Sequence, residues 1–166
     1  QVEQHRFSME SLRGIRLFEH LSYKELIFLL NVTEAQTFAL GEAVVREDET
    51  GDTLFLLVSG RCEVSKGGEA VATLRAGDHF GEMALVDRFP RSATVRALEP
   101  VQVRAVRRGP FYELLRSDPL LSNKILWNIV QVLSARLRET SNELEELRRG
   151  PDSAPEPTRA VSTRRP

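Results

Sequence analysis

Glycine turns recur through the middle of the chain, and their spacing constrains the fold more than any other feature. Between about Gln36 and Val106, short runs rich in Val, Leu, Phe and Thr alternate with these turns. The turns lie at Gly41, Gly51, Gly60, Gly67–Gly68 and Gly77. Short strands separated by about ten residues are typical of an antiparallel sandwich or barrel. The clearest hairpin is predicted at Lys66-Gly67-Gly68-Glu69, which joins runs at 62–65 and 70–74.

Helical patterns precede the β region. Two apolar sets with helical spacing lie within residues 1–32. Ser22, with Glu25 three residues later, forms the pattern of a capping box that starts the second helix. Val71 and Ala72, in the β region, are expected to pack in the core, although an apolar wall for a ligand is the alternative.

Helical patterns also follow the β region. A short helix is predicted over 111–116, after Gly109-Pro110, and Ser117-Asp118-Pro119 ends it. A long helix is then predicted over about 120–149, and Gly150-Pro151 ends it. The last stretch, 150–166, is rich in Pro, Ser, Thr and Arg and is predicted to be disordered.

Composition excludes several classes of function. The 166 residues are 41% hydrophobic and 28% charged, as in an ordinary globular domain. The net charge of −1 provides no basic surface for nucleic acid or for anionic membrane. The longest apolar runs, Leu26–Leu30 and Leu54–Val58, are too short to cross a membrane. A single cysteine, Cys62, favours a reducing compartment, and we expect a cytoplasmic protein. Because the chain opens on Gln1, we interpret it as a piece of a longer protein.

The run from Phe80 to Val95, FGEMALVDRFPRSATV, carries the clearest chemistry. Gly81 allows the backbone to approach a ligand closely, and the helix-compatible residues after it can present unpaired N–H groups to an anion. Arg91 can bind phosphate oxygens with two parallel hydrogen bonds. Glu82 would repel a phosphate, so we expect it to accept a hydrogen bond from an uncharged group such as a sugar hydroxyl. The alternative is a plain turn between two strands with a surface Glu–Arg pair.

This run resembles the phosphate-binding cassette of the cyclic-nucleotide-binding domain family, found in catabolite activator proteins, protein kinase A regulatory subunits and nucleotide-gated channels. The family pattern is F-G-E, an aliphatic residue, A-L, a variable loop, then P-R, a small residue, A-T and an aliphatic residue, and the chain matches it. The resemblance implies that Glu82 holds the ribose 2′-hydroxyl and Arg91 the cyclic phosphate. Backbone amides around Met83 and Ala84, with Ser92, would complete the phosphate site.

The resemblance also implies the fold and the ligand. We expect a mainly β protein with flanking helices, that is, a jelly-roll-like β-roll (double-stranded β-helix) with N-terminal helices and a long C-terminal helix. This domain would cover 11–149, after a linker or the end of an upstream region at 1–10. Cyclic AMP is the first choice of ligand because Ser92 follows the cassette arginine, where a threonine often accompanies cyclic-GMP preference in the family. Cyclic GMP remains possible.

The long helix carries a heptad pattern. Its seam follows alternating spacings of four and three, at Leu126, Val130, Leu133, Leu137, Thr140, Leu144 and Leu147. Such a seam predicts a two-stranded coiled coil and hence a homodimer. The alternative is a helix that packs on its own β domain, and Ile125, Trp127 and Ile129 are expected to do so as well.

Thr140 is the one polar residue of this seam. The segment 136–141 resembles the part of the dimer helix of the catabolite activator protein in which adjacent Thr and Ser contact adenine. The resemblance implies that Thr140 and Ser141 contact the base. The alternative, that Thr140 only sets the register of the dimer, stays open.

These observations predict a regulatory sensor that binds a cyclic nucleotide and does not catalyse. The three histidines are too scattered for a metal site, and no nucleophile motif is present. We expect an attached upstream effector domain and no binding to DNA, because catabolite activators continue into a winged helix-turn-helix where this chain has its low-complexity tail. The alternatives are a ligand-free interaction module of the same fold and a jelly-roll enzyme.

Overall fold

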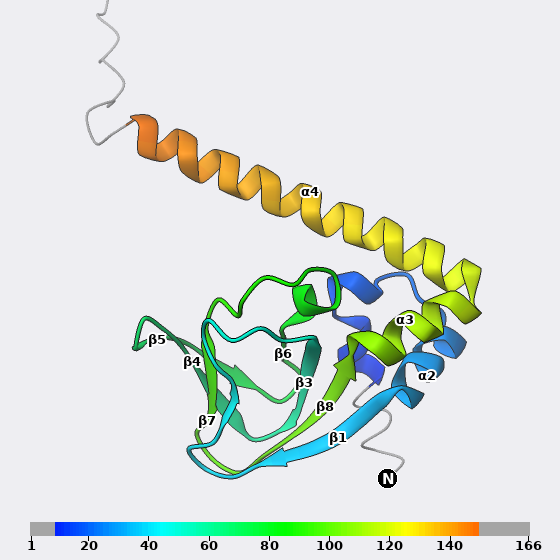
Figure 1. Ribbon diagram of the computed structural model, residues 1–166, viewed down its shortest axis with the longest axis horizontal. Helices are drawn as coiled ribbons and strands as arrows, with labels where there is room; N and C mark the ends of the chain where they lie inside the picture. The colour runs from blue at the N-terminus through cyan, green and yellow to red at the C-terminus, as the bar shows by residue number, and fades with distance from the viewer. Residues whose placement is uncertain (1–8, 150–166) are drawn as a thin grey trace, which may run out of the picture. The chain divides into compact units, whose positions relative to one another are not determined.

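The fold is a pair of four-stranded antiparallel sheets with helices before and after them (Figure 1). This computed structural model describes residues 9–149. Sheet A has the strand order β1-β8-β3-β6 and sheet B the order β2-β7-β4-β5. The strands are β1 (Thr33–Phe38), β2 (Ala43–Val45), β3 (Thr53–Ser59), β4 (Arg61–Lys66), β5 (Glu69–Arg75), β6 (His79–Phe80), β7 (Thr94–Ala97) and β8 (Val101–Arg107). The predicted β-roll with flanking helices is confirmed.

Helical segments flank the sheets and interrupt them once. They are a turn at 9–13, η1 (Arg16–Phe18), α2 (Tyr23–Asn31), η2 (Glu82–Leu85), α3 (Arg108–Ser117) and α4 (Pro119–Arg149). The chain divides into two units after Val132, so α4 begins in the first unit and ends in the second. The predicted tail and most of the predicted linker lie outside the described residues.

Sheet A carries a hydrophobic cluster on each face. Leu54 and Leu56 of β3 belong to a cluster with the helices, whereas Phe55 and Leu57 belong to the cluster between the sheets. Alternate residues of a strand point to opposite faces, so a strand covered on both sides reads as a continuous apolar run. The run that begins at Leu54 is therefore the central strand of the domain.

The predicted hairpin at Gly67–Gly68 is confirmed, since β4 pairs with β5 across this turn. The core role expected of Val71 and Ala72 is wrong. β5 is an edge strand of sheet B, and Val71 is 60% exposed. Period-two patterns show that a strand exists but not whether another layer covers it.

The helices after β8 begin earlier than predicted. α3 starts at Arg108 and includes Gly109 and Pro110, because the missing N–H of a proline in the first helical turn would have no acceptor there in any case. Asp118 then caps α4: its Oδ1 accepts from the amides of Leu120 at 3.1 Å and Leu121 at 3.0 Å.

The first part of α4 packs on the N-terminal helical region through one face. Its buried residues are Leu121, Ile125, Asn128 and Val132. The packing predicted for Ile125 is confirmed, and Ile129 packs against the same cluster while partly buried. The packing predicted for Trp127 is wrong, since this side chain is 62% exposed. Trp127 is two residues from Ile125 and so lies on another side of the helix.

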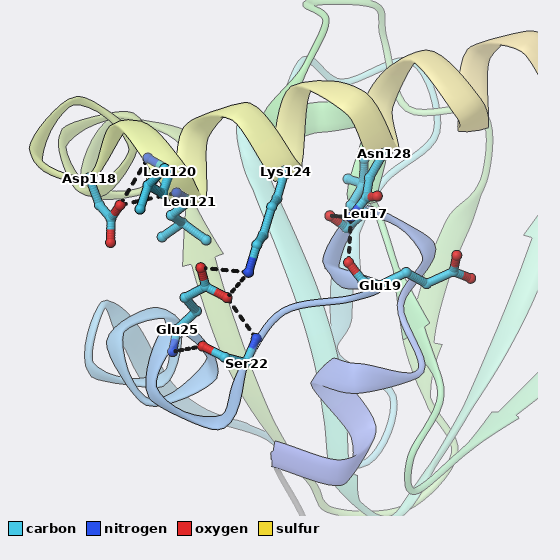
Figure 2. A network of polar contacts seen from close by, with 9 residues as sticks. All are labelled: Leu17, Glu19, Ser22, Glu25, Asp118, Leu120, Leu121, Lys124 and Asn128. Atoms are coloured by element: carbon cyan, nitrogen blue, oxygen red, sulfur yellow. Dashed lines mark hydrogen bonds and ion pairs between the residues drawn. The ribbon is translucent and has the colours of Figure 1, made fainter.

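A polar network fixes this packing (Figure 2). Lys124 Nζ binds both carboxylate oxygens of Glu25, at 3.0 and 2.8 Å. The carboxylate of Glu25 also accepts from the amide of Ser22 at 2.6 Å, and Ser22 Oγ accepts from the amide of Glu25, so the predicted capping box is confirmed. Glu25 is nearly buried, and these bonds replace the water that it loses.

Asn128 makes a second polar contact in the same interface (Figure 2). Its Nδ2 donates to the carbonyl oxygens of Leu17 at 3.1 Å and Glu19 at 2.7 Å. A buried amide with fixed partners allows only one axial position of α4 against η1. Polar contacts, and not only apolar packing, therefore fix the position of the start of α4.

Replacing Glu25 by Gln should destabilise the domain at neutral pH and not in acid. Burial raises the pKa of Glu25, but hydrogen bonds from Lys124 and Ser22 lower it below its ordinary value. The stabilisation is thus present above about pH 4.3 and is lost as pH falls through the lower folded-state pKa. We expect a loss of about 1–2 kcal/mol near neutral pH. Urea denaturation of wild type and Glu25→Gln at a series of pH values checks this. A difference in the free energy of unfolding that stays constant into acid would contradict it.

Candidate functional site

The predicted cassette forms a turn of 3-10 helix between β6 and β7. Gly81 precedes this helix with φ of 78°, a left-handed conformation that favours glycine. The amide of Ala84 donates to the carbonyl of Gly81 at 3.1 Å, so the expectation that this N–H is unpaired is wrong. The amide of Met83 has no acceptor within residues 9–149, as expected at the start of a helix. One of the two predicted amides is therefore available to a ligand.

The guanidinium of Arg91 lies between two glycines. A Cβ placed on Gly51 would lie 2.6 Å from Arg91 Nε and 2.8 Å from Cζ. A Cβ on Gly81 would overlap Arg91 Nη1 and lie 2.9 Å from the carbonyl oxygen of Thr53. The absence of side chains at both positions thus makes room for the arginine. Arg91 is thus a close neighbour of Gly81, and the expected close approach of a ligand to Gly81 stays a prediction.

The loop between β2 and β3 holds Arg91 by its backbone. The amide of Arg91 donates to the carbonyl of Glu49, and its carbonyl accepts from the amide of Asp48, both at 2.9 Å. Arg91 Nη2 donates to the carbonyl of Thr53 at 2.8 Å. Both the main chain and the side chain of Arg91 are therefore positioned before any ligand binds.

The electrostatic surroundings leave the charge of Arg91 without an ion pair. Burial lowers the pKa of Arg91 most, the charge of Arg108 lowers it further, and Asp52 and Glu82 raise it. An arginine remains protonated in such surroundings. In the described part of the chain, no carboxylate lies within ion-pair distance of Arg91. A desolvated cation with free hydrogen-bond donors is a favourable partner for an oxyanion.

Two hollows lie beside this arrangement. One, of about 160 Å³, is lined by Arg91 and by residues of β2, the β2–β3 loop and β3. The other, of about 390 Å³, is lined by Thr50, Gly51, Asp52, Arg88 and Arg108. Four arginines, Arg46, Arg88, Arg91 and Arg108, and two acidic residues, Glu49 and Asp52, line the two hollows. The excess of positive charge suits an anion.

Arg108 is a site residue that sequence reasoning missed. Its Nε donates to the carbonyl of Ala84 at 2.8 Å, and its Nη2 donates to the carbonyls of Ala84, Asp87 and Gly51. These bonds join the end of η2 to the loop that carries Gly51. In the sequence, Arg108 is only an arginine between a predicted strand and Gly109, and no motif marks an arginine there as a site residue.

The other predicted residues are placed as follows. Glu82 is partly buried at the start of η2, near enough to Arg91 to act on its pKa. Ser92 is exposed and follows Arg91 directly. Thr140 and Ser141 are exposed on α4 in the second unit, which is described by itself. Their contact with a base stays a prediction.

Within residues 9–149, no helix is long and apolar enough to span a bilayer. Nor does that part of the chain bring together three or more His, Cys, Asp or Glu side chains that could hold a metal ion.

Comparison with known proteins identifies the domain. The sequence profile described as the cyclic nucleotide-binding domain matches residues 35–118, from β1 to the residue that caps α4. The chain belongs to the cyclic nucleotide-binding domain family. The resemblance read from the cassette is therefore confirmed.

Individual relatives of this cyclic nucleotide-binding domain include kinase subunits and a bacterial receptor. A cAMP-dependent protein kinase regulatory subunit of Debaryomyces hansenii is 37% identical over 105 residues, 63% of this chain and 23% of that protein. The cyclic AMP receptor protein of Thermus thermophilus is 30% identical over 141 residues, 82% of this chain and 63% of that protein. The chain thus spans less than two thirds of either relative.

A solved structure supports the same assignment. The crystal structure of a cyclic nucleotide-binding domain from Methylobacillus flagellatus has a TM-score of 0.69 and 30% identity to this chain. The match covers 87% of this chain and 84% of that one. The β-roll and its flanking helices are therefore those of the family.

Replacing Arg108 by Lys should loosen the cassette. A lysine keeps the charge but cannot reach three carbonyls with a planar fork, so we expect a loss of about 1–3 kcal/mol in stability. Amides at 82–87 should exchange with solvent faster, as measured by hydrogen exchange. The matched control is Arg107→Lys, because Arg107 makes only an exposed ion pair with Glu34. Equal effects of the two substitutions would contradict the role of Arg108.

Proposed function

We propose that the domain binds a cyclic nucleotide, with cyclic AMP as the preferred ligand, and that Arg91 binds its phosphate. The observation that carries this proposal is the partly buried guanidinium of Arg91, which is packed between Gly51 and Gly81 and has no ion pair within residues 9–149. The cyclic phosphate carries a single negative charge and two non-bridging oxygens, which suit the hydrogen-bond donors of such a guanidinium.

The groups around Arg91 are proposed to bind the rest of the phosphate and the ribose. The amide of Met83 donates to the phosphate from the start of η2, with Ser92 beside it. Glu82 accepts a hydrogen bond from the ribose 2′-hydroxyl. In this assignment Gly81 shapes the position of Arg91 and does not itself bind the ligand. Arg108 acts indirectly, by fixing the end of η2.

Cyclic AMP is chosen over cyclic GMP on two grounds. The residue after Arg91 is Ser92, not the threonine that often accompanies cyclic-GMP preference. The two relatives described above are named for cyclic AMP. Titration with both nucleotides tests this choice separately from the phosphate assignment.

Replacing Arg91 by Ala should abolish most of the binding. We expect a loss of about 2–5 kcal/mol, since a buried charged partner is removed from the ligand phosphate. Isothermal calorimetry with cyclic AMP measures it, and circular dichroism checks that the variant folds without the bond to Thr53. Arg107→Ala is the control, because it removes an exposed arginine outside the site. Equal affinities of wild type and Arg91→Ala would remove the phosphate assignment, and no binding by wild type would favour a ligand-free interaction module.

We further propose that α4 forms a parallel homodimer. The predicted seam is strongly exposed within one chain: Leu137 is 69%, Leu144 57% and Leu147 79% exposed. Exposed leucines at heptad spacing favour association with a second copy. In a parallel pair, Glu143 on one helix and Arg148 on the other occupy facing flanking positions and carry opposite charges. An antiparallel pair would not bring these two positions together.

Replacing Leu137 by Asp should convert the dimer to a monomer. A carboxylate in the middle of an apolar seam is buried without a partner, so we expect the dissociation constant to rise by at least about a hundredfold. Sedimentation equilibrium measures it. The control is Leu120→Asp, because Leu120 is 76% exposed on the same helix but lies off the seam. A wild-type monomer at high concentration would contradict the proposal.

The role of such a domain is proposed to be regulatory. Binding would shift a pre-existing equilibrium in the position of α4, by no more than the difference in ligand affinity between the two states. An attached effector domain would respond to this shift, and no catalytic role is proposed for this chain. We place the protein in the cytoplasm, where a buried free thiol such as Cys62 stays reduced.

A further inference from the structure

A third hollow, of about 250 Å³, lies on sheet A and shares no lining residue with those at the cassette. Residues of β1, the end of β3 and the middle of β8 line it, among them Ala35, Val58 and Arg104. The proposed function uses none of these residues.

Strand alternation explains why this hollow exists. Val103 and Ala105 of β8 face the cluster between the sheets, so Arg104 between them faces the opposite side. Ala35 is paired with Arg104 across the ladder and therefore shares its face. A register shift between Leu57 and Ser59 leaves Val58 without a partner on β8, and Val58 forms part of the wall.

Arg104 is an unusual cation. Its guanidinium is partly buried, and burial lowers the pKa of this side chain. Nε donates to Thr33 Oγ1 at 2.6 Å, and Thr33 Oγ1 in turn donates to the carbonyl of Leu30 at 2.8 Å. This chain of bonds fixes the orientation of the guanidinium from one side.

The other four N–H groups of Arg104 have no acceptor within residues 9–149, and no carboxylate there forms an ion pair with it. Arg91, the proposed phosphate ligand, shares this combination of partial burial, one anchoring bond and no ion pair. A guanidinium that is fixed from one side, has unused N–H donors and lies in a hollow is a favourable partner for an oxyanion.

We propose that this hollow is a second anion site, in which Arg104 binds the carboxylate or phosphate group of a small organic ligand and Ala35 and Val58 contact its apolar part. The site is independent of cyclic-nucleotide binding. Its chemistry is that of an oxyanion attached to a short aliphatic group.

Nuclear magnetic resonance at the Nε–Hε group of Arg104 tests the proposal. The bond to Thr33 slows exchange of this proton, and Arg104→Lys identifies the signal by removing it. Inorganic phosphate, acetate and butyrate are titrated at ionic strength held constant with NaCl. We expect a saturable shift in the millimolar range for phosphate, for the carboxylates, or for both, which distinguishes the two sources of the oxyanion. Butyrate should bind at least about threefold more tightly than acetate, because its extra methylenes contact Ala35 and Val58.

Controls separate this site from the cassette. Backbone amides of β1 and β8 provide a second readout, which Arg104→Gln should abolish and Arg75→Gln, at an exposed arginine of β5, should leave unchanged. The titration is repeated in Arg91→Ala, so loss of the cassette cannot account for the result. Shifts that do not saturate with any of the three anions, or that persist in Arg104→Gln, would overturn the proposal.

Discussion

A single guanidinium explains much of the geometry around the cassette. The side chain of Arg91 fills the space in which Gly51 and Gly81 have no Cβ, and its backbone pairs with the loop before β3. Partial burial of this charge is costly unless hydrogen bonds replace the water that it loses, and the carbonyl of Thr53 supplies one of them. Arg91 therefore fixes the position of η2 relative to β3 and to the loop before it.

The fold could be predicted to a large extent because its signals are local. The paired glycines between β4 and β5 and the capping box at Ser22 both act within a few residues. The central strand was visible as an apolar run because both of its faces are covered. The cassette was visible because its chemistry lies in one short segment.

What could not be predicted depends on contacts between distant segments. The bonds of Arg108 to Ala84 join the start of α3 to the cassette, and no local pattern marks either residue. The exposure of Val71 depends on β5 being an edge strand, which the strand's own residues do not encode. The start of α3 was misplaced because Gly109 and Pro110 normally interrupt helices but are tolerated in a first turn. In each case tertiary context decided the outcome.

The sole tryptophan of the chain, Trp127, lies exposed on α4, away from the face that packs on the N-terminal helical region. An indole in water emits at longer wavelength than one that is covered by apolar groups. The protein thus carries its own optical reporter at the helix proposed to move and to associate. Because Asn128, the next residue, is anchored to the N-terminal region, the polarisation of this emission follows the docking of α4 without any added label.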